Sequence, residues 1–362
     1  MPLNADAETW LRFVLTPLSC RIRLKLLREF GSPQAVLESR VGRLQDMLEP
    51  KLAMMLADAG CRSEWAELAS HLAWLSEPGN RLLTLADAAY PASLLDLPDA
   101  PAVLFIKGDP AWLSRPALAL VGSRQATPQG LENAEAFASN LSQAGYTVIS
   151  GMAAGIDAAA HTGGLAGAGS TVAVVGTGLD RVYPASNRQL AHRIVECGAM
   201  VSEFPLGYPP KAEHFPRRNR LIAALGLGCL VVEATLGSGS LITARQAADL
   251  GREVFAIPGS IHSPQSKGCH RLIKEGAKLV ESAQDIHDEL SAPLLPGLKP
   301  VALKQRNNED PILLQMGWDP VDLDTLSTRT GTGADVLGAV LLTLELDGLI
   351  AVLPGGRYQR KG

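Results

Sequence analysis

The sequence predicts a doubly wound α/β domain with a mostly parallel, Rossmann-like sheet, flanked by an N-terminal helical domain and a C-terminal winged-helix domain. Three observations support this. From about residue 115, short apolar runs alternate with helical segments. Several of these runs end directly in turns that contain glycine. Near residue 290 the apolar periodicity stops, and it resumes in a different pattern. Strands that alternate with helical crossovers are typical of parallel sheets.

The central domain is expected over residues 115–290. Its apolar runs carry few polar side chains, which indicates strands covered on both faces. The helical segments between them suit right-handed crossovers. The predicted strands cover 117–121, 146–150, 171–176, 199–202, 229–234, 253–258 and 277–280.

Residues 1–75 show short amphipathic helices, with a stop at Gly31 and a restart at Pro33 in the first turn of the next helix. The pattern is similar to SAM-like or helix-hairpin-helix modules. A short helical bundle by itself gives little information about function. We therefore expect a structural scaffold here rather than a DNA-binding module. Residues 76–114 are expected to form a connector, because the stretch "YPASLLDLPDAP" is rich in proline.

Residues 291–308 lose periodicity and gain proline and polar residues, which is typical of a linker. Residues 309–362 show three helical segments and a hairpin that turns at Pro354-Gly355-Gly356, the outline of a winged helix. From residue 305 onward there are five basic residues against eight acids, and the predicted recognition helix (333–347) has no Lys or Arg. Reading a DNA groove needs positive charge, so we expect this domain to contact protein.

Composition describes a chain with a sizeable core and little overall charge. Its 362 residues are 46% hydrophobic, and the formal net charge is -4. Nucleic-acid binding would therefore need a local basic patch. The five cysteines are far apart and form no C-x-x-C pair, which argues against a disulfide framework and a thiolate metal site. No signal peptide or membrane-length apolar run is evident, so we expect a cytoplasmic protein.

Four predicted strands run directly into turns of small residues: "GSRQAT", "GMAAGID", "GTGLD" and "TLGSGSLITAR". In a doubly wound sheet these carboxyl ends share one edge and face helix N-termini, whose free N–H groups favour anions. A dinucleotide cofactor is not expected, because Arg181 stands where the third glycine of the fingerprint belongs. The P-loop pattern is absent as well. We therefore expect several phosphate sites and no cofactor.

Arg124 follows Gly122 and Ser123 at the start of a predicted helix. Backbone N–H donors beside a guanidinium suit the oxygens of a phosphate. A structural salt bridge is the alternative interpretation of this arginine.

The segment "KAEHFPRRNR" (211–220) carries four basic residues and one acid. Pro216 suits the first turn of a helix that runs to Gly226, and basic side chains at such a start form an anion site. If exposed, Phe215 offers a face on which a nucleobase can stack. Nucleic acid, a nucleotide and a sugar phosphate all fit this pattern.

A structural interpretation of the same segment stays open. Phe215 would then pack into the core as a hydrophobic staple at the helix start. The arginines would pair with nearby acids, of which the candidates are Glu203, Glu213 and Glu233.

Asp157 and His161 lie four residues apart, hence on one face of a predicted helix. One His and one Asp are too few for a metal site, and no serine or cysteine nucleophile accompanies them. We expect a helix-to-loop hydrogen bond here, with no catalytic role and no metal.

Seven stretches of the sequence together resemble the DNA-processing protein A family (DprA, also called Smf). They are "GSRQATPQG", "VISGMAAGIDAAAH", "TVAVVGTGLDRVYPASN", "SEFPLG", "HFPRRNRLIAAL", "VVEATLGSGSLITARQAADLGREVFAIPG" and "GCHRLIKEGA". They occur in the family's order over about residues 85–290, and the flanking domains fit the family's layout.

The resemblance implies a non-catalytic protein that binds single-stranded DNA. It would protect incoming DNA, load the recombinase RecA onto it during natural transformation and homologous recombination, and act as a homodimer. The implied DNA-binding residues are Gly122, Ser123, Arg124, Lys211, Phe215, Arg217, Arg218, Asn219, Arg220, Ser238, Gly239 and Ser240. The implied self-association surface lies in "CHRLIKEGAKLV", with His270, Ile273 and Leu279 as candidates.

An enzyme is the main alternative class. A nucleotide-phosphate hydrolase or phosphoribohydrolase on a related Rossmann-like fold would also place its site at glycine-rich strand ends. It would need an activated water or a nucleophile, and the best candidates, Glu203 and Asp157, lack an evident partner. A scaffold whose basic segment docks an acidic protein is a third class, and it would tolerate the removal of Phe215.

Overall fold

The structure is a computed structural model that describes residues 5–61, 65–290 and 310–361. Its centre is one sheet with the strand order β1-β2-β6-β5-β4-β3-β7-β8-β9. The strands from β3 to β9 pair in parallel, which confirms the predicted class of sheet. The bounds are β1 Asn80–Thr84, β2 Val103–Gly108, β3 Ala117–Val121, β4 Thr147–Ser150, β5 Thr171–Val174, β6 Ala199–Ser202, β7 Gly228–Val231, β8 Glu253–Ala256 and β9 Lys278–Leu279.

The segment 76–114 corrects our prediction of a connector, because it contributes β1 and β2 to the sheet. Strand β2 pairs antiparallel with β6, and β1 pairs antiparallel with β2. The proline-rich stretch is the loop between these two strands, closed by a 2.7 Å hydrogen bond from the Tyr90 hydroxyl to the Pro101 carbonyl. This stretch contains the 3₁₀ helix Ala92–Asp96 and connects two strands of one sheet, so it is not the predicted connector between domains.

The strand order reverses beside β3. The chain proceeds from β3 through β4 and β5 to β6 in one direction, and then continues at β7 on the other side of β3. The crevice at the carboxyl ends of β3 and β7 is therefore the switch point, where doubly wound sheets bind their ligands.

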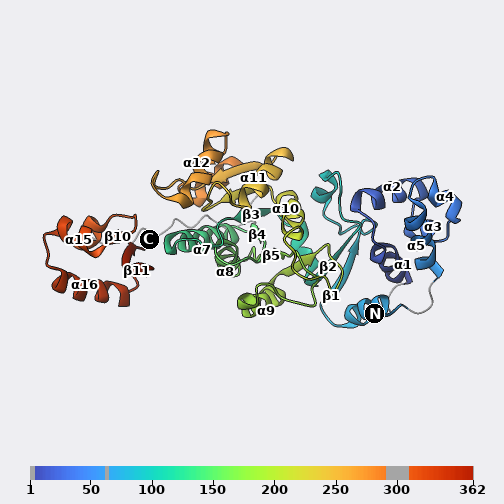
Figure 1. Cartoon of the computed structure of the whole chain (residues 1–362), viewed down its shortest axis with the longest axis horizontal. Helices are drawn as coiled ribbons and strands as arrows, with labels where there is room; N and C mark the ends of the chain where they lie inside the picture. The colour runs from blue at the N-terminus through green and yellow to red at the C-terminus, as the bar shows by residue number, and fades with distance from the viewer. Residues whose placement is uncertain (1–4, 62–64, 291–309, 362) are drawn as a thin grey trace.

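Helices cover both faces of the sheet (Figure 1). Strand β3 shows why its sequence is apolar throughout: Leu118 and Leu120 belong to the core on one face, and Ala119 belongs to the core on the other. One face packs against α7 Pro128–Gln143, α8 Ile156–Gly164, α9 Arg188–Cys197 and α13 Ala283–Leu290. The other packs against α10 His214–Leu225, α11 Ser240–Asp249 and α12 Lys267–Lys274.

The N-terminal region is helical, as predicted. The helix signals are local: Ser19 accepts a hydrogen bond from the Ile22 N–H, and Gly31, at φ 83°, ends the second helix. The third helix begins at Pro33. The bounds are α1 Ala5–Leu15, α2 Cys20–Phe30, α3 Pro33–Leu37, α4 Val41–Gln45, α5 Pro50–Cys61 and α6 Ala66–Ser76.

The C-terminal region forms the predicted winged helix around its own small core. Its hairpin turns through Gly355 and Gly356, whose φ values of 83° and 68° suit glycine. The bounds are α14 Pro311–Met316, β10 Val321–Asp322, α15 Leu323–Thr330, α16 Ala334–Leu346, β11 Ile350–Leu353 and β12 Arg357–Arg360. The predicted linker, 291–308, lies outside the described residues. Within the three described ranges, no helix combines the length and apolar character needed to cross a membrane.

The close packing of α7 against α8 gives a test of the fold. A Cβ atom on Gly163 would overlap the carbonyl oxygen of Glu135. We expect Gly163→Ala to lower the free energy of unfolding by roughly 1–3 kcal/mol, the usual cost of overpacking. Urea unfolding of the two proteins measures this.

The control for that test is Gly42→Ala, because a Cβ on Gly42 meets no atom within 4 Å. Gly42 lies in α4, so the control substitution should be neutral or slightly stabilising. Equal stability of the Gly163→Ala protein and the wild type would show that the two helices can move apart freely.

Candidate nucleic-acid interface

A cleft of about 740 Å³ lies at the switch point of the sheet, between the turns that follow β3 and β7 and the start of α10. Most of the predicted DNA-binding residues line it. These are Gly122, Ser123, Arg124, Phe215, Arg218, Asn219, Ser238, Gly239 and Ser240. Three others, Lys211, Arg217 and Arg220, are not among the residues that line this cleft.

The turn after β3 is held rigidly by its neighbours. The Ser123 N–H donates to the Glu233 carbonyl at 2.7 Å, and the Ser123 hydroxyl accepts from the Gln125 N–H at 3.1 Å. A Cβ on Gly122 would lie 2.6 Å from the Ile156 side chain and 2.9 Å from that same carbonyl. The glycine is therefore required for the turn to pack between β7 and α8.

Arg124 is exposed at the mouth of the cleft. In the described part of the chain no carboxylate pairs with it, so the salt-bridge alternative lacks a partner there. Its guanidinium lies 5.2 Å from the centre of the Phe215 ring, within the range of a cation–π contact.

Phe215 lines the cleft from the first turn of α10, and its ring is half-buried. It lies 5.8 Å, centre to centre, from the ring of Tyr183, which is 46% exposed. Sequence reasoning missed Tyr183. The signal was present, because Tyr183 follows the glycine turn after β5 and therefore returns to the same edge of the sheet.

Helix α10 places its arginines on two different sides. Arg217 and Arg220 each donate to one oxygen of Glu203, at 3.1 Å and 2.6 Å. The Glu203 side chain is 1% exposed. Burial alone would lower the pKa of Arg217, but the Glu203 carboxylate outweighs it and raises that pKa. The predicted alternative, pairing with Glu203, describes these two arginines.

Further contacts join this ion-pair cluster to neighbouring elements. The Arg217 guanidinium also lies 3.2 Å from the Cys20 sulfur of α2, and Arg220 Nε lies 3.3 Å from the Asp99 carboxylate. Lys211 lies elsewhere, exposed on a surface that it shares with Asp180. The basic segment thus divides among three places, and only part of it reaches the cleft.

Asp157 and His161 are both buried in α8. Asp157 accepts from the Ala153 N–H at 3.3 Å, which is the expected helix-to-loop hydrogen bond. Burial raises the pKa of Asp157. In the ranges that the structure describes, no three His, Cys, Asp or Glu side chains are grouped to hold a metal ion.

The candidates for self-association lie near the edge strand β9. Leu279 is half exposed on that strand. Ile273 packs partly against the core, and His270 Nε2 lies 3.0 Å from the Gly259 carbonyl. Of the three, Leu279 is the side chain that most clearly faces solvent.

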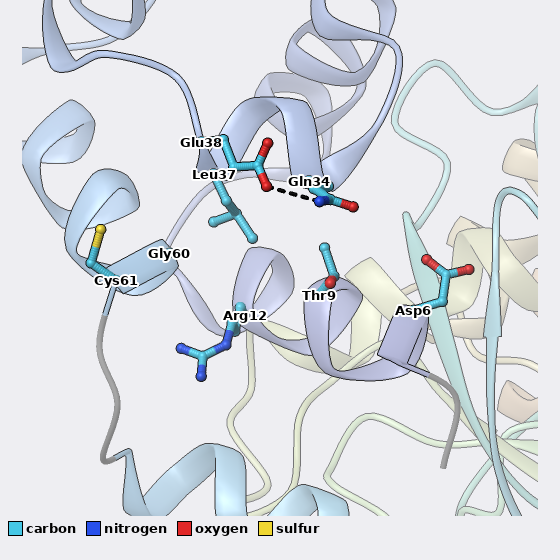
Figure 2. Close-up of a pocket in the computed structure, with 8 residues that line it drawn as sticks. All are labelled: Asp6, Thr9, Arg12, Gln34, Leu37, Glu38, Gly60 and Cys61. Atoms are coloured by element: carbon cyan, nitrogen blue, oxygen red, sulfur yellow. Dashed lines mark hydrogen bonds between the residues drawn. The ribbon is translucent and has the colours of Figure 1, made fainter. Parts of the chain in front are cut away.

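A separate pocket lies within the N-terminal helices (Figure 2). Its Gln34 and Glu38 side chains bond to each other at 2.8 Å. Arg12 pairs with Glu8 at 2.8 Å and also donates to the Ala59 carbonyl. These polar groups already have partners, so this pocket offers weaker anion binding than the cleft.

Comparison with known proteins agrees with this geometry. The profile of the DNA recombination-mediator protein A family matches residues 81–291, more than half of the chain. The chain belongs to this family. The DprA winged helix domain matches residues 299–356, which include most of the C-terminal region that the structure describes.

Relatives of the DNA recombination-mediator protein A family show how far the similarity extends. Protein Smf of Escherichia coli is 41% identical over 296 residues, which cover 79% of each chain. The solved DprA of Streptococcus pneumoniae has a TM-score of 0.69 and 37% identity, and the match covers 80% of this chain and 99% of that one. The solved Helicobacter pylori protein, described for its single-stranded DNA binding mode, has a TM-score of 0.54 and 29% identity over 58% of this chain and 96% of that one.

The buried imidazole behind the cleft predicts a pH dependence of stability. Thr171 Oγ1 donates to the Val148 carbonyl, so it accepts from Nδ1 of His161 at 2.7 Å, and the Nε2 atom is left without a partner. Burial, with the charge of Arg218, lowers the pKa of His161 to about 3. The pKa of His161 is higher in the unfolded chain, so as the pH falls the unfolded chain takes up a proton before the folded chain does.

Stability from this group is therefore complete above about pH 6.5 and is lost as the pH falls toward 3. We expect roughly 3 kcal/mol less unfolding free energy at pH 4 than at pH 6.5 from His161 alone. Urea unfolding across this range should give a shallower pH dependence for His161→Gln than for the wild type. Exposed His262→Gln is the control, and parallel curves for all three proteins would contradict the prediction.

Proposed function

We propose that this protein binds single-stranded DNA in the cleft at the switch point and does no chemistry on it. The observation that carries the proposal is the meeting, in one cleft, of an aromatic pair (half-buried Phe215 and exposed Tyr183), an exposed arginine and glycine-serine turns at helix starts. The Helicobacter pylori relative, described for its single-stranded DNA binding, supports the assignment.

The aromatic pair favours a single strand over a duplex. Phe215 and Tyr183 present ring faces in a cleft, and only an unpaired base can leave its own stack to lie on such a face. Base–aromatic stacking depends little on sequence, because every base has a π-face. We therefore propose binding without strong sequence preference.

The phosphate contacts would come from the turns and from Arg124. Helices α8 and α11 begin beside the cleft, and the N-terminus of a helix favours an anion. Ser238 and Ser240 add hydroxyl groups 2.7 Å apart at the start of α11. These donors position a backbone and carry no base information.

The alternative of a hydrolase loses support at its two candidate residues. Glu203 is buried in ion pairs with Arg217 and Arg220, behind α10 and not among the residues that line the cleft. Asp157 lines the cleft, but it is buried and accepts a hydrogen bond from the Ala153 N–H, which holds the loop before α8. Glu203 is thus committed to two arginines, and Asp157 to the loop before its own helix.

Three further parts of the proposal follow from family membership. The protein would protect incoming DNA and load RecA onto it during natural transformation and homologous recombination. It would act as a homodimer through the β9 edge, where Leu279 is exposed. It would work in the cytoplasm, a location with which its five free thiols agree.

The DNA site can be tested with one arginine–aromatic pair in the cleft and a matched pair at the opposite edge of the sheet. We expect Phe215→Ala to weaken the affinity for labelled oligo-dT by about 5- to 150-fold, because stacking is worth roughly 1–3 kcal/mol per base. Arg124→Ala should also weaken the affinity for oligo-dT, and it should reduce the slope of log affinity against log salt because a phosphate contact is lost. Fluorescence anisotropy over a salt series, with oligo-dT and a duplex, measures both effects.

Arg115 and Trp112 supply the controls for that experiment. Arg115 stacks on Trp112 at 3.9 Å, as Arg124 lies over Phe215, but at the opposite edge of the sheet, before β3. Arg115→Ala and Trp112→Ala should leave affinity unchanged. Equal losses of affinity from both pairs would place the DNA elsewhere. Binding by Phe215→Ala as tight as that of the wild type would leave only electrostatic docking.

For the C-terminal domain we propose a protein contact. Its would-be recognition helix, α16, exposes Val336, Leu342 and Leu346, the last 80% exposed. The helix carries no Lys or Arg. An apolar surface without positive charge suits a protein partner better than a phosphate backbone.

Truncation after residue 290 tests this assignment. We expect the shortened chain to bind oligo-dT within about threefold of the full chain, because the removed domain supplies no phosphate contacts. Anisotropy with the same oligonucleotide measures it. A large loss of affinity, or tight duplex binding that disappears with the domain, would assign DNA contacts to the winged helix.

A further inference from the structure

Glu233 follows the end of β7 and binds both ends of the turn after β3 (residues 122–127). Its main-chain carbonyl accepts from the Ser123 N–H at 2.7 Å. Its carboxylate accepts from the Thr127 hydroxyl at 2.6 Å and from the Thr127 N–H at 2.9 Å. In the sequence Glu233 is a candidate partner of the arginines, but in the structure its carboxylate binds Thr127.

The carboxylate of Glu233 fits closely against the first turn of α7. Thr127 is the N-cap residue of this helix, and its hydroxyl also accepts from the Gly130 N–H at 3.0 Å. A Cβ atom on Gly130 would overlap the carboxylate of Glu233. The free N–H groups and the dipole at a helix N-terminus stabilise a negative charge. Hydrogen bonds, close packing and electrostatics thus all fix this end of the turn.

Between its two ends, the turn after β3 exposes one cation, Arg124. The Ser123 carbonyl accepts from the Ile156 N–H at 3.1 Å. The Gln125 carbonyl accepts from the side-chain amide of Gln265 at 2.9 Å. The main chain on either side of Arg124 is therefore fixed, while its side chain is exposed at the mouth of the cleft. A group on a fixed main chain loses less conformational entropy when it binds a ligand than a group on a mobile loop.

We propose that Glu233 is a positioning residue for DNA binding: it holds the turn after β3 so that Arg124 meets a phosphate in one fixed geometry. Glu233 is not among the residues that line the cleft, so it acts through Arg124 and not by contact with the ligand. This inference rests on the proposed function for its effect on DNA affinity. The hold of Glu233 on the turn can be measured without DNA.

Two substitutions of similar size separate the hydrogen bonds of Glu233 from its volume. In Glu233→Gln the amide oxygen can accept from the Thr127 N–H, and the amide nitrogen can donate to the Thr127 hydroxyl oxygen. In Glu233→Met both contacts are lost. We expect Glu233→Met to weaken the affinity for labelled oligo-dT about tenfold, the worth of one hydrogen bond to a charged group, and Glu233→Gln to stay within about threefold of the wild type. Fluorescence anisotropy measures both affinities.

Combined substitutions test whether Glu233 acts through Arg124. In an Arg124→Ala background, Glu233→Met should have less than about a twofold further effect, because the side chain that it positions is already absent. Alone, Glu233→Met should lower the slope of log affinity against log salt by about 0.7, the value for one phosphate on a single strand. An equal loss of affinity in both backgrounds, or an unchanged slope, would overturn the proposal.

Trypsin cleavage after Arg124 reports on the turn without DNA. A protease cuts a locally unfolded segment, so a fixed turn protects even an exposed arginine. Cleavage at this bond, followed by mass spectrometry, should be about tenfold faster in Glu233→Met than in the wild type and should stay slow in Glu233→Gln. Arg40, exposed between α3 and α4, is the control site and should be cut at one rate in all three proteins. Equal rates after Arg124 in all three would contradict the proposal.

Thr127→Val is the second variant, in case Glu233→Met does not fold. It removes the hydroxyl that donates to Glu233, whereas Thr127→Ser keeps a hydroxyl there. Thr127→Val should therefore open the turn to trypsin and weaken oligo-dT binding, and Thr127→Ser should do neither. Identical behaviour of the two variants would count against the contact.

The positioning role and the DNA function can fail separately. Faster cleavage after Arg124 in Glu233→Met, together with a wild type that does not bind oligo-dT, would retain the hold of Glu233 on the turn and remove the DNA function. Oligo-dT binding that Glu233→Met leaves unchanged, together with slow cleavage in both proteins, would retain the DNA function and remove the positioning role.

Discussion

The carboxylate of Glu203 fixes the orientation of α10, and the rest of the cleft depends on that orientation. It is buried, and it binds two arginines three residues apart on the helix. Because those side chains must face Glu203, the rotation of the helix about its axis is set. Phe215, Arg218 and Asn219 are then the side chains that remain on the cleft side. A buried ion pair adds little stability in many proteins, but it can specify geometry, and here it does so.

Glycines shape the cleft as much as its lining side chains do, because a Cβ atom at these positions would overlap neighbouring atoms. Gly122 lets the turn after β3 pack against β7, and Gly151 leaves the space that the Arg218 side chain fills. Gly155, at φ 79°, begins α8 beside the Ser123 carbonyl. These glycines let backbone N–H groups and one guanidinium approach a common point, which larger residues would block. The family's glycine-rich turns thus have a steric reason in this chain.

Much of the fold could be predicted from the sequence, because β3 to β8 are covered on both faces and are therefore mostly apolar. Strands β1 and β2 are not evident in the sequence, because they flank a proline-rich loop. They also pair antiparallel, so no crossover helix lies between them to indicate a sheet. The glycine turns alone indicate which edge of the sheet carries the candidate site.

The assignment of single residues in the site was harder. "RRNR" shows three arginines in four positions, and nothing local in the sequence says which of them faces the sheet edge. That depends on where Glu203 lies, and Glu203 reaches α10 only through the folded sheet. For Tyr183, the preceding glycine turn indicates the edge of the sheet, but the contact with Phe215 depends on the path of a loop.

The Arg217 contact with Cys20 joins α10 to the N-terminal helices. The N-terminal helices and the sheet share one continuous apolar cluster, in which Trp10 and Phe13 join Phe105 and Met200. The His71 ring also accepts from the Leu206 N–H at 2.9 Å. The sequence changes character near residue 75, but the packing is continuous across that point. We therefore expect the helical region and the sheet to unfold together.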